Sequence, residues 1–189
     1  MGCGPLALGK IASLASASSP TAILLQPTHT GTALPGPSFA LLQVRSVADA
    51  LDLLTAGETV HDYKPNDAAP ATTATKTVRL QRLPRMLVLY LMRFDPASLN
   101  KVAKHVSFEP RLAMRRAWLT PDSQDKRAEY QLVATVSHHG RSISSGHYTA
   151  DVLQPDGKFL RFDDDTVSSV SLQTVLSERV YLLFYARQN

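Results

Sequence analysis

A histidine and a run of three aspartates stand at the two ends of a short stretch in the C-terminal half of the chain. The first end reads Ser145-Gly146-His147 and the second Asp163-Asp164-Asp165. Between them, Gln154-Pro155-Asp156-Gly157 combines a proline, which fixes φ, with a glycine, which tolerates positive φ. This pattern predicts a turn between two antiparallel strands. A turn centred on its Pro-Asp pair sets His147 opposite Asp164, within one residue of register.

Such a hairpin would bring an imidazole and a carboxylate together. Directly opposed residues have Cβ atoms roughly 4.5–5.5 Å apart, which allows an aspartate to hydrogen-bond a histidine ring, fix its tautomer and stabilise its protonated form. A nucleophilic hydrolase uses this kind of pair as its base and the group that orients the base. The alternative is a solvated surface histidine beside an acidic turn, and the pairing alone leaves both interpretations open.

Composition narrows the class of protein. The chain has 189 residues, 44% of them hydrophobic, which suits a globular domain with a buried core. Cys3 is the only cysteine, so the sequence excludes an internal disulfide and a cysteine-rich zinc site. This usage fits a reducing compartment, and we expect the cytoplasm, the nucleus or both. No apolar run approaches the ~20 residues of a membrane-spanning helix, so no membrane partner is expected.

Other residues near the hairpin suggest alternative chemistry. His138 and His139 could form a metal site with His147, but adjacent residues of a strand point to opposite faces, so both cannot easily bind one ion. We therefore expect structural histidines, no metal and no cofactor. Ser144 and Ser145 lie close to His147 in sequence, yet the segment lacks the final glycine of a nucleophile elbow and no helix follows it. We expect these serines to form loop hydrogen bonds.

Positive charge is concentrated in residues 76–127. This segment holds 12 Lys/Arg against 4 Asp/Glu, whereas both flanks are net negative. A basic surface can bind nucleic acid. The segment contains no recognisable nucleic-acid-binding motif, however, and we expect a solvated basic face instead of a nucleic-acid partner.

The order of elements predicts an α+β fold dominated by an antiparallel sheet. A capping-box pattern at Ser46 and Asp49 opens a helix that Gly57 closes. Residues 63–76, rich in Pro, Ala, Asn and Thr, indicate a loop or fingertip. Strands are expected at residues 39–44, 86–92, 101–108, 130–137 and 180–185, and a short helix at residues 172–176.

The N-terminal part differs in composition from the rest. Residues 1–38 contain no Asp or Glu and show no sustained hydrophobic period. We expect them to form a disordered, low-complexity lead-in to one ordered unit, residues 39–187.

Four blocks of the sequence resemble the C-terminal half of ubiquitin-specific proteases. They are LPRMLVLYLMRF at residues 83–94, HHG through GHYT at residues 138–149, FDDDTV at residues 162–167 and YLLFY at residues 181–185. Residues 39–63 most resemble the ubiquitin-specific protease ten subgroup, which likewise lacks zinc cysteines near this point.

The resemblance implies a fold and a site. The family has a papain-like, hand-shaped catalytic domain of thumb, palm and fingers, of which this chain would supply the palm and part of the fingers, an incomplete domain. It hydrolyses the bond after the ubiquitin C-terminus. By motif position, His147 corresponds to the general base, Asp163 to the residue that orients it and Asp164 to an adjacent carboxylate that assists. Residues 140–146 resemble the loop over the ubiquitin tail, and its candidate residues are Gly140, Arg141, Ser144, Ser145 and Gly146.

The resemblance does not extend to a nucleophile. The family's cysteine lies in an Asn- and Gly-rich box that is absent here, and the neighbours of Cys3 do not match it, so no nucleophile is identified. We expect a deubiquitinase whose His/Asp part is on this chain, with ubiquitin and ubiquitinated proteins as partners, and we expect this chain alone to be inactive. The alternative is a catalytically inactive, ubiquitin-binding pseudo-protease fragment.

Overall fold

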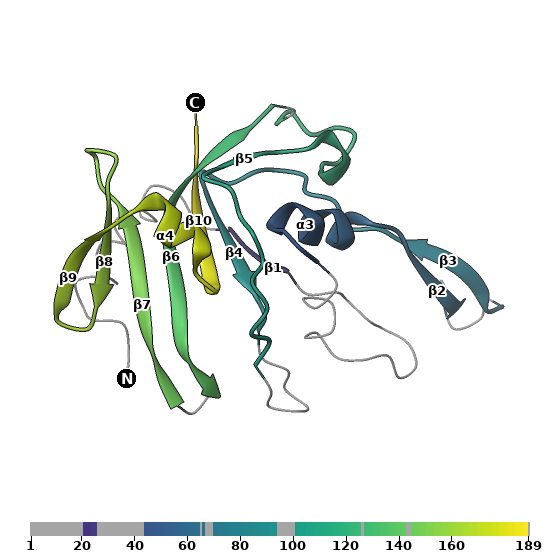
Figure 1. Cartoon of the computed structure of the whole chain (residues 1–189). Coiled ribbons are helices and arrows are strands. Elements are labelled where there is room, and N and C mark those ends of the chain that lie inside the picture. Colours follow the sequence, from purple (N-terminus) through teal and green to yellow (C-terminus); the bar gives the residue numbers. More distant parts are fainter. Residues whose placement is uncertain are drawn as a thin grey trace.

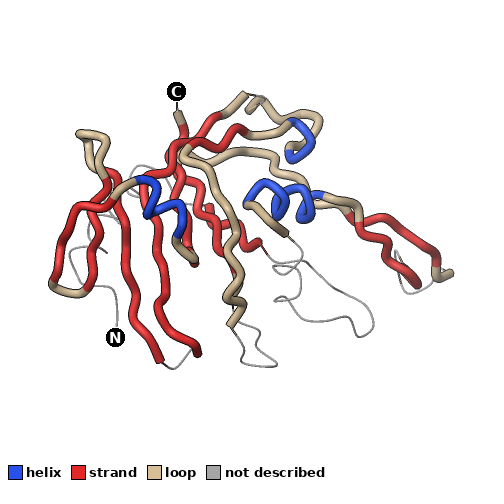
Figure 2. Tube along the Cα trace, viewed as in Figure 1, coloured by secondary structure: helices blue, strands red, loops and turns tan. Residues whose placement is uncertain are grey.

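The computed structural model describes residues 21–25, 44–64, 66, 70–93, 101–125, 127–142 and 145–188. Their main element is one large, mostly antiparallel sheet with few helices beside it (Figures 1 and 2). The expected α+β class, dominated by an antiparallel sheet, is confirmed.

The large sheet has eight strands. Seven follow the order β1-β4-β10-β6-β7-β8-β9, and β5 pairs with β6 outside this path. β1 runs parallel to β4, and the other pairs in this sheet are antiparallel. The strands are β1 (Thr21–Leu25), β4 (Met86–Leu91), β5 (Arg111–Ala113), β6 (Glu129–Ser142), β7 (Ser145–Leu153), β8 (Phe159–Asp163), β9 (Thr166–Val170) and β10 (Val180–Arg187). Because β6 to β9 are neighbours both in sequence and in the sheet, His147 and the three aspartates lie on or beside adjoining strands.

β4 is the buried strand that its apolar run predicts. Leu87, Leu89 and Leu91 are fully buried, and the strand lies between β1 and β10. Burying one large apolar side chain contributes ~1.5–3 kcal/mol, so each of these three leucines stabilises the sheet. The core on the side of α4 (Leu172–Ser177) also contains Leu183 and Tyr185 of β10 and Val175 of α4.

The helix α3 (Val47–Thr55) begins as its sequence predicts. Ser46 Oγ accepts a hydrogen bond from the Asp49 backbone N–H at 3.0 Å, and the Asp49 carboxylate accepts one from the Ser46 N–H at 3.0 Å. This reciprocal capping box satisfies two backbone donors at the start of the helix. The helix ends in the extended residue Ala56, and Gly57 does not adopt a positive φ, so the predicted glycine cap is wrong. A short 3-10 helix, η1 (Arg116–Trp118), packs near α3.

A second, two-stranded sheet projects from α3 away from the large sheet (Figure 1). It consists of β2 (Glu58–Tyr63) and β3 (Thr72–Lys76). The prediction that residues 63–76 are a loop is therefore wrong for β3. Threonine-rich TTATK lacks the apolar alternation of a half-buried strand because both of its faces are largely exposed, yet threonine itself favours extended structure.

Two other segments depart from the sequence-based expectations. Residues 101–108 contain only isolated bridge residues instead of a strand, since the Val102 N–H donates to Arg93 and the Ser107 N–H to Arg45. Within the expected lead-in, residues 1–38, the structure places strand β1, which pairs with β4. The rest of the lead-in and residues 39–43 lie outside the described residues. No helix among the described residues is long and apolar enough to cross a membrane.

Candidate active site

The β7–β8 hairpin carries the candidate site, and its turn sets the register. The Gly157 N–H donates to the Gln154 carbonyl at 3.0 Å, and Gln154 pairs with Lys158. Gly157 has φ +83°, so the connection is a three-residue loop that ends in a left-handed glycine. The register predicted from a two-residue loop is therefore off by one residue. In the structure, Asp163 of β8 pairs with Thr149 of β7.

This shift decides which aspartate shares a face with His147. Residues two apart on a strand lie on one face, so His147 lies on the same face as Thr149 and its partner Asp163. His147 Nε2 is 3.5 Å from Asp163 Oδ1, and the two side chains are about half exposed. Asp164 is exposed and occupies the turn after β8 with φ +47°, a left-handed conformation that aspartate tolerates. Of the two candidate carboxylates, Asp163 is the one that the structure pairs with the ring.

The geometry of the His147–Asp163 pair suits a base and the group that orients it. A separation of 3.5 Å exceeds an ordinary N–H···O hydrogen bond, and catalytic hydrogen bonds in ligand-free sites are often long and tighten in the complex. The contact uses Nε2, which leaves Nδ1, across the ring, to exchange a proton with a reacting group. Because the His147 side chain is about half exposed, a partner from outside these strands can reach the ring.

Two candidate loop glycines allow β6 and β7 to approach closely beside the site. A Cβ on Gly140 would overlap the Ser145 carbonyl oxygen and lie 3.0 Å from the His138 ring. Gly146 has φ +148°, and a Cβ there would overlap the His139 carbonyl oxygen and lie 2.6 Å from His138 Nε2. Both positions therefore require glycine for packing within the hairpin itself.

The structure describes the other candidate loop residues only in part. Arg141 lies near the end of β6, and Ser145 is the exposed first residue of β7, paired with Ser142. Ser144 lies outside the described residues, as does Cys3, the only cysteine of the chain. The structure thus brings together His147, Asp163 and the two glycines, and it assigns no position to a thiol.

His138 and His139 contact different residues, on opposite faces of β6, as their adjacency predicts. The His138 ring packs against the Tyr148 and Tyr181 rings, at centroid distances of 4.7 and 5.8 Å. His139 Nε2 lies 2.8 Å from Thr149 Oγ1, and its ring stacks on that of His147. Among the described residues, no three His, Cys, Asp or Glu side chains cluster as a metal site.

Lys101 fixes the end of β6 next to the candidate site. Its Nζ donates to the carbonyls of His138 at 2.7 Å and Gly140 at 2.8 Å, and lies 3.1 Å from His138 Nδ1. Burial lowers the pKa of Lys101, and burial, followed by the Lys101 charge, lowers the pKa of His138. The local sequence around Lys101 does not predict this role, because nothing in it marks a contact with residues 37 and 39 positions away.

An ion network on the face of the sheet that carries His139 holds β7, β8 and α4 together. Arg161 donates to both Asp151 carboxylate oxygens, at 2.8 and 2.9 Å, and to Glu178 at 2.7 Å. Asp151 is only 1% exposed, and the paired carboxylates raise the pKa of Arg161, the Asp151 hydrogen bonds first. This network was not predicted from the sequence either. Charged residues at alternate strand positions, Asp151, Arg161 and Asp163, are the signal that could have indicated a polar face.

Comparisons with known proteins identify the family. A sequence model of ubiquitin carboxyl-terminal hydrolases matches residues 16–185. The chain belongs to the ubiquitin carboxyl-terminal hydrolase family. The match begins inside the expected lead-in and includes β1, so the family region extends further toward the N-terminus than residue 39.

Curated hydrolases of this family share about a third of the aligned residues. Ubiquitin carboxyl-terminal hydrolase 24 of Arabidopsis thaliana is 36% identical over 146 residues, which cover 75% of this chain and 26% of the relative. Ubiquitin carboxyl-terminal hydrolase 10 of Mus musculus is 34% identical over 157 residues, which cover 77% of this chain and 20% of the relative. The chain therefore spans 26% of the length of the first hydrolase and 20% of the length of the second.

Solved structures show the same fold. The yeast SAGA DUB module with an Sgf73 mutant matches with a TM-score of 0.69 and 29% identity, over 77% of this chain and 33% of the yeast chain. A SAGA Ubp8/Sgf11/Sus1/Sgf73 module bound to monoubiquitin matches with a TM-score of 0.66 and 28% identity, over the same shares. The expectation of a papain-like, ubiquitin-specific protease fold, of which the chain forms a part, is confirmed.

Proposed function

We propose that this chain supplies the general base and its orienting carboxylate to a thiol-dependent deubiquitinase. His147 is the base and Asp163 the orienting residue. The observation that supports this most directly is the His147 Nε2 to Asp163 Oδ1 contact of 3.5 Å on a partly exposed hairpin, in a chain of the hydrolase family. Asp164 is proposed as a neighbouring acid that contributes to the local negative charge.

The proposed reaction is hydrolysis of the bond that follows the C-terminal carboxyl group of ubiquitin. His147 takes the proton of a cysteine thiol, and the thiolate attacks the carbonyl carbon. The protonated ring gives its proton to the leaving amine as the C–N bond breaks, and the ubiquitin acyl group stays on sulfur as a thioester. Water then attacks the thioester while His147 accepts a water proton, the C–S bond breaks, and His147 returns the proton to the thiolate. Asp163 holds the ring tautomer and stabilises the imidazolium at each step.

The thiol of this reaction is proposed to lie outside this chain. Cys3 is flanked by Gly2, Gly4 and Pro5, whereas the box that the family resemblance implies is rich in Asn and Gly. We propose that the chain alone hydrolyses no ubiquitin conjugate. Ubiquitin and ubiquitinated proteins are the proposed partners, in the cytoplasm, the nucleus or both, and the monoubiquitin bound by the yeast module supports the first of these.

Reconstitution tests the catalytic proposal. The part of the mouse hydrolase 10 relative that this chain does not match is supplied in trans, and release of a fluorogenic amine from the ubiquitin C-terminus is followed. We expect His147→Ala to lower kcat/KM on the order of 10⁴-fold and Asp163→Asn on the order of 10²- to 10⁴-fold. His105→Ala is the matched control, because His105 is a partly exposed histidine that contacts the Leu176 carbonyl. A larger loss for Asp164→Asn than for Asp163→Asn contradicts the assignment.

A second candidate function is ubiquitin binding without catalysis, and the lack of a family cysteine box favours it. A ubiquitin probe with a thiol-reactive C-terminus, added to the chain alone, separates the candidates. We expect no covalent adduct, and specific labelling of Cys3 overturns the proposal that the thiol comes from elsewhere. Binding of unmodified ubiquitin, measured by calorimetry, combined with no activity after reconstitution, supports the binding module.

A further inference from the structure

The imidazole ring of His139 lies against the ring of His147, the proposed base. The two are cross-strand partners, His139 on β6 and His147 on β7. Their rings stack with a centroid distance of 5.0 Å and an interplanar angle of 29°. Because cross-strand partners on a sheet share a face, each ring limits the rotamers open to the other.

A hydrogen bond fixes the His139 ring of the stack, which is partly buried. His139 Nε2 lies 2.8 Å from Thr149 Oγ1, and Thr149 is 3% exposed and is the strand partner of Asp163. His139 is thereby tied to the residue beside the carboxylate that His147 contacts. Asp163 pairs with Thr149 across the strands, Thr149 is hydrogen-bonded to His139, and the His139 ring stacks on the His147 ring.

We propose that His139 is a positioning residue for His147: its ring is the surface against which the His147 ring is held within reach of Asp163, and a charge on His147 opposes a proton on His139. This inference rests on the proposed role of His147 as the base. It adds a residue to the site that contacts no reacting atom and acts only through the stack.

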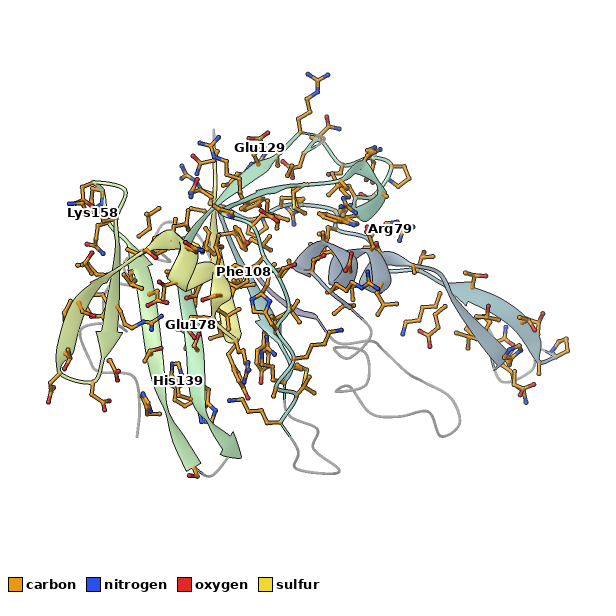
Figure 3. The ribbon with its side chains drawn as sticks, viewed as in Figure 1. Arg79, Phe108, Glu129, His139, Lys158 and Glu178 are labelled. Carbon is orange, nitrogen blue, oxygen red and sulfur yellow. The ribbon has the colours of Figure 1, made fainter. Side chains whose placement is uncertain are left out.

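The surroundings of His139 favour its uncharged form. Burial is the largest cause and lowers the pKa of His139, and the charges of His147 and Arg161 lower it further, while Glu178 and Asp163 raise it. These groups come from three neighbouring elements: His147 from β7, Arg161 and Asp163 from β8, and Glu178 from the end of α4. Figure 3 shows His139 and Glu178 on the same side of the sheet, below α4, and both residues line an open pocket of about 430 Å³. Lys101 and Arg179 add two cations to the lining of the same pocket.

Ring titration by NMR tests the electrical part of the proposal on the full chain without ubiquitin. The Cε1–Hε1 signals of the histidines are followed between about pH 4.5 and 8.5, and His147→Gln is compared with the unsubstituted chain. Two unit charges about 5 Å apart in a water-like medium perturb each other by on the order of half a pH unit, so we expect the His139 midpoint to rise by about that much in His147→Gln. Glu178→Gln is expected to lower the midpoint, and the control His105→Gln to leave it unchanged. A His139 midpoint that does not move in His147→Gln overturns the coupling.

Ring ordering tests the positioning part. His139→Phe keeps a flat ring in the stack and His139→Ser removes it, and ¹³C relaxation of the His147 ring reports its mobility. We expect His147 to become mobile in His139→Ser and to stay ordered in His139→Phe, with backbone amide spectra showing that the hairpin is folded. Thr149→Val, which removes the hydrogen bond but retains both rings, covers the case in which His139→Ser does not fold, and it is expected to loosen the stack partly. An ordered His147 ring in a folded His139→Ser or Thr149→Val variant overturns the positioning role. Because neither measurement involves ubiquitin, both give an answer even where the proposed hydrolase function fails.

Discussion

The hairpins β7–β8 and β2–β3 are both antiparallel pairs of strands, but different interactions stabilise them. β7 and β8 keep five consecutive residue pairs in register, and Arg161 ties them to each other and to α4 through Asp151, 1% exposed, and Glu178. β2 and β3 break register between Val60 and Tyr63, and the ion pair between them, Lys76 to Glu58, spans 4.0 Å with both side chains partly exposed. Buried charged side chains hold the β7–β8 hairpin together, whereas the β2–β3 hairpin is held by backbone pairing and has exposed faces.

The difference separates two mechanical roles. A histidine that transfers protons and the aspartate that orients it must keep their distance, and a site built on packed strands keeps it better than a site on a loop. A hairpin with exposed faces can instead adapt its twist to a surface that it meets. We therefore expect the β7–β8 hairpin to be the stiff part of the chain and the β2–β3 hairpin the adaptable one.

The largest expected effect comes from breaking the buried network with Arg161→Met. This change leaves the Asp151 carboxylate buried without its cation, and breaking a buried pair from one side costs about 3–5 kcal/mol. Lys76→Met, which breaks the exposed pair of the other hairpin, is the matched control and is expected to cost less than about 1 kcal/mol. Urea unfolding of the full chain measures both, and equal losses would remove the contrast between the hairpins.

The next largest effect comes from the same substitution in two glycines. Gly146→Ala places a Cβ against the His139 backbone and the His138 ring at φ +148°, and we expect a loss of at least about 3 kcal/mol. Gly57→Ala, beside β2, meets only the methyl groups of Thr75 at 3.0 Å and Thr77 at 3.7 Å, without a positive φ. We expect a change of less than about 1 kcal/mol there. Thermal unfolding compares the two, and a Gly146→Ala variant as stable as Gly57→Ala would show that the close approach of β6 and β7 is not required.

Sequence patterns that span a few residues predicted the elements whose own contacts are short-range in sequence. The capping box at Ser46, the apolar run of β4 and the short helix α4 all form where the sequence indicates, because each depends on residues a few positions apart. The β7–β8 hairpin was predicted as well, with a register error of one residue. That error comes from the left-handed Gly157, which adds a residue to the turn that a Pro-Asp-Gly sequence alone does not count.

Long-range contacts account for what the sequence did not predict. Arg161 meets Asp151 and Glu178, and Lys101 meets the carbonyls of β6, only because the sheet brings distant segments together. Residues 101–108 bury Val102, Val106 and Phe108 and so look like a strand, yet their backbone bonds go to single residues and not to a ladder. The Thr-rich strand β3 was missed for the opposite reason, since it pairs along a ladder without burying a face.

A smaller effect is expected from pH. Burial lowers the pKa of His138 and of His139 from the ordinary value of 6.5. Below that value the unfolded chain binds more protons than the folded chain, so the free energy of unfolding falls as the pH drops from about 6.5 through the lower folded values. We expect the protection factors of backbone amides, taken relative to the intrinsic exchange rate at each pH, to fall first in β6 and β7, while those of β2, whose His61 is exposed, change little. Exchange measured at about pH 7.5 and 5.5 checks this, and a uniform response of both hairpins would contradict it.

The smallest expected effect concerns the exposed ion pair between β2 and β3, Glu58 and Lys76. A double-mutant cycle of Glu58→Gln and Lys76→Met isolates the coupling between the two side chains, which meet at 4.0 Å with side-chain exposures of 29% and 40%. Since solvent screens such a pair, we expect a coupling energy of about 0.2–0.5 kcal/mol that disappears in about 0.5 M salt. Urea unfolding of the four chains at low and high salt gives the value. A coupling above ~1 kcal/mol that survives salt would mean that this hairpin, too, is held by charge, and the proposed division into a stiff and an adaptable hairpin would not hold.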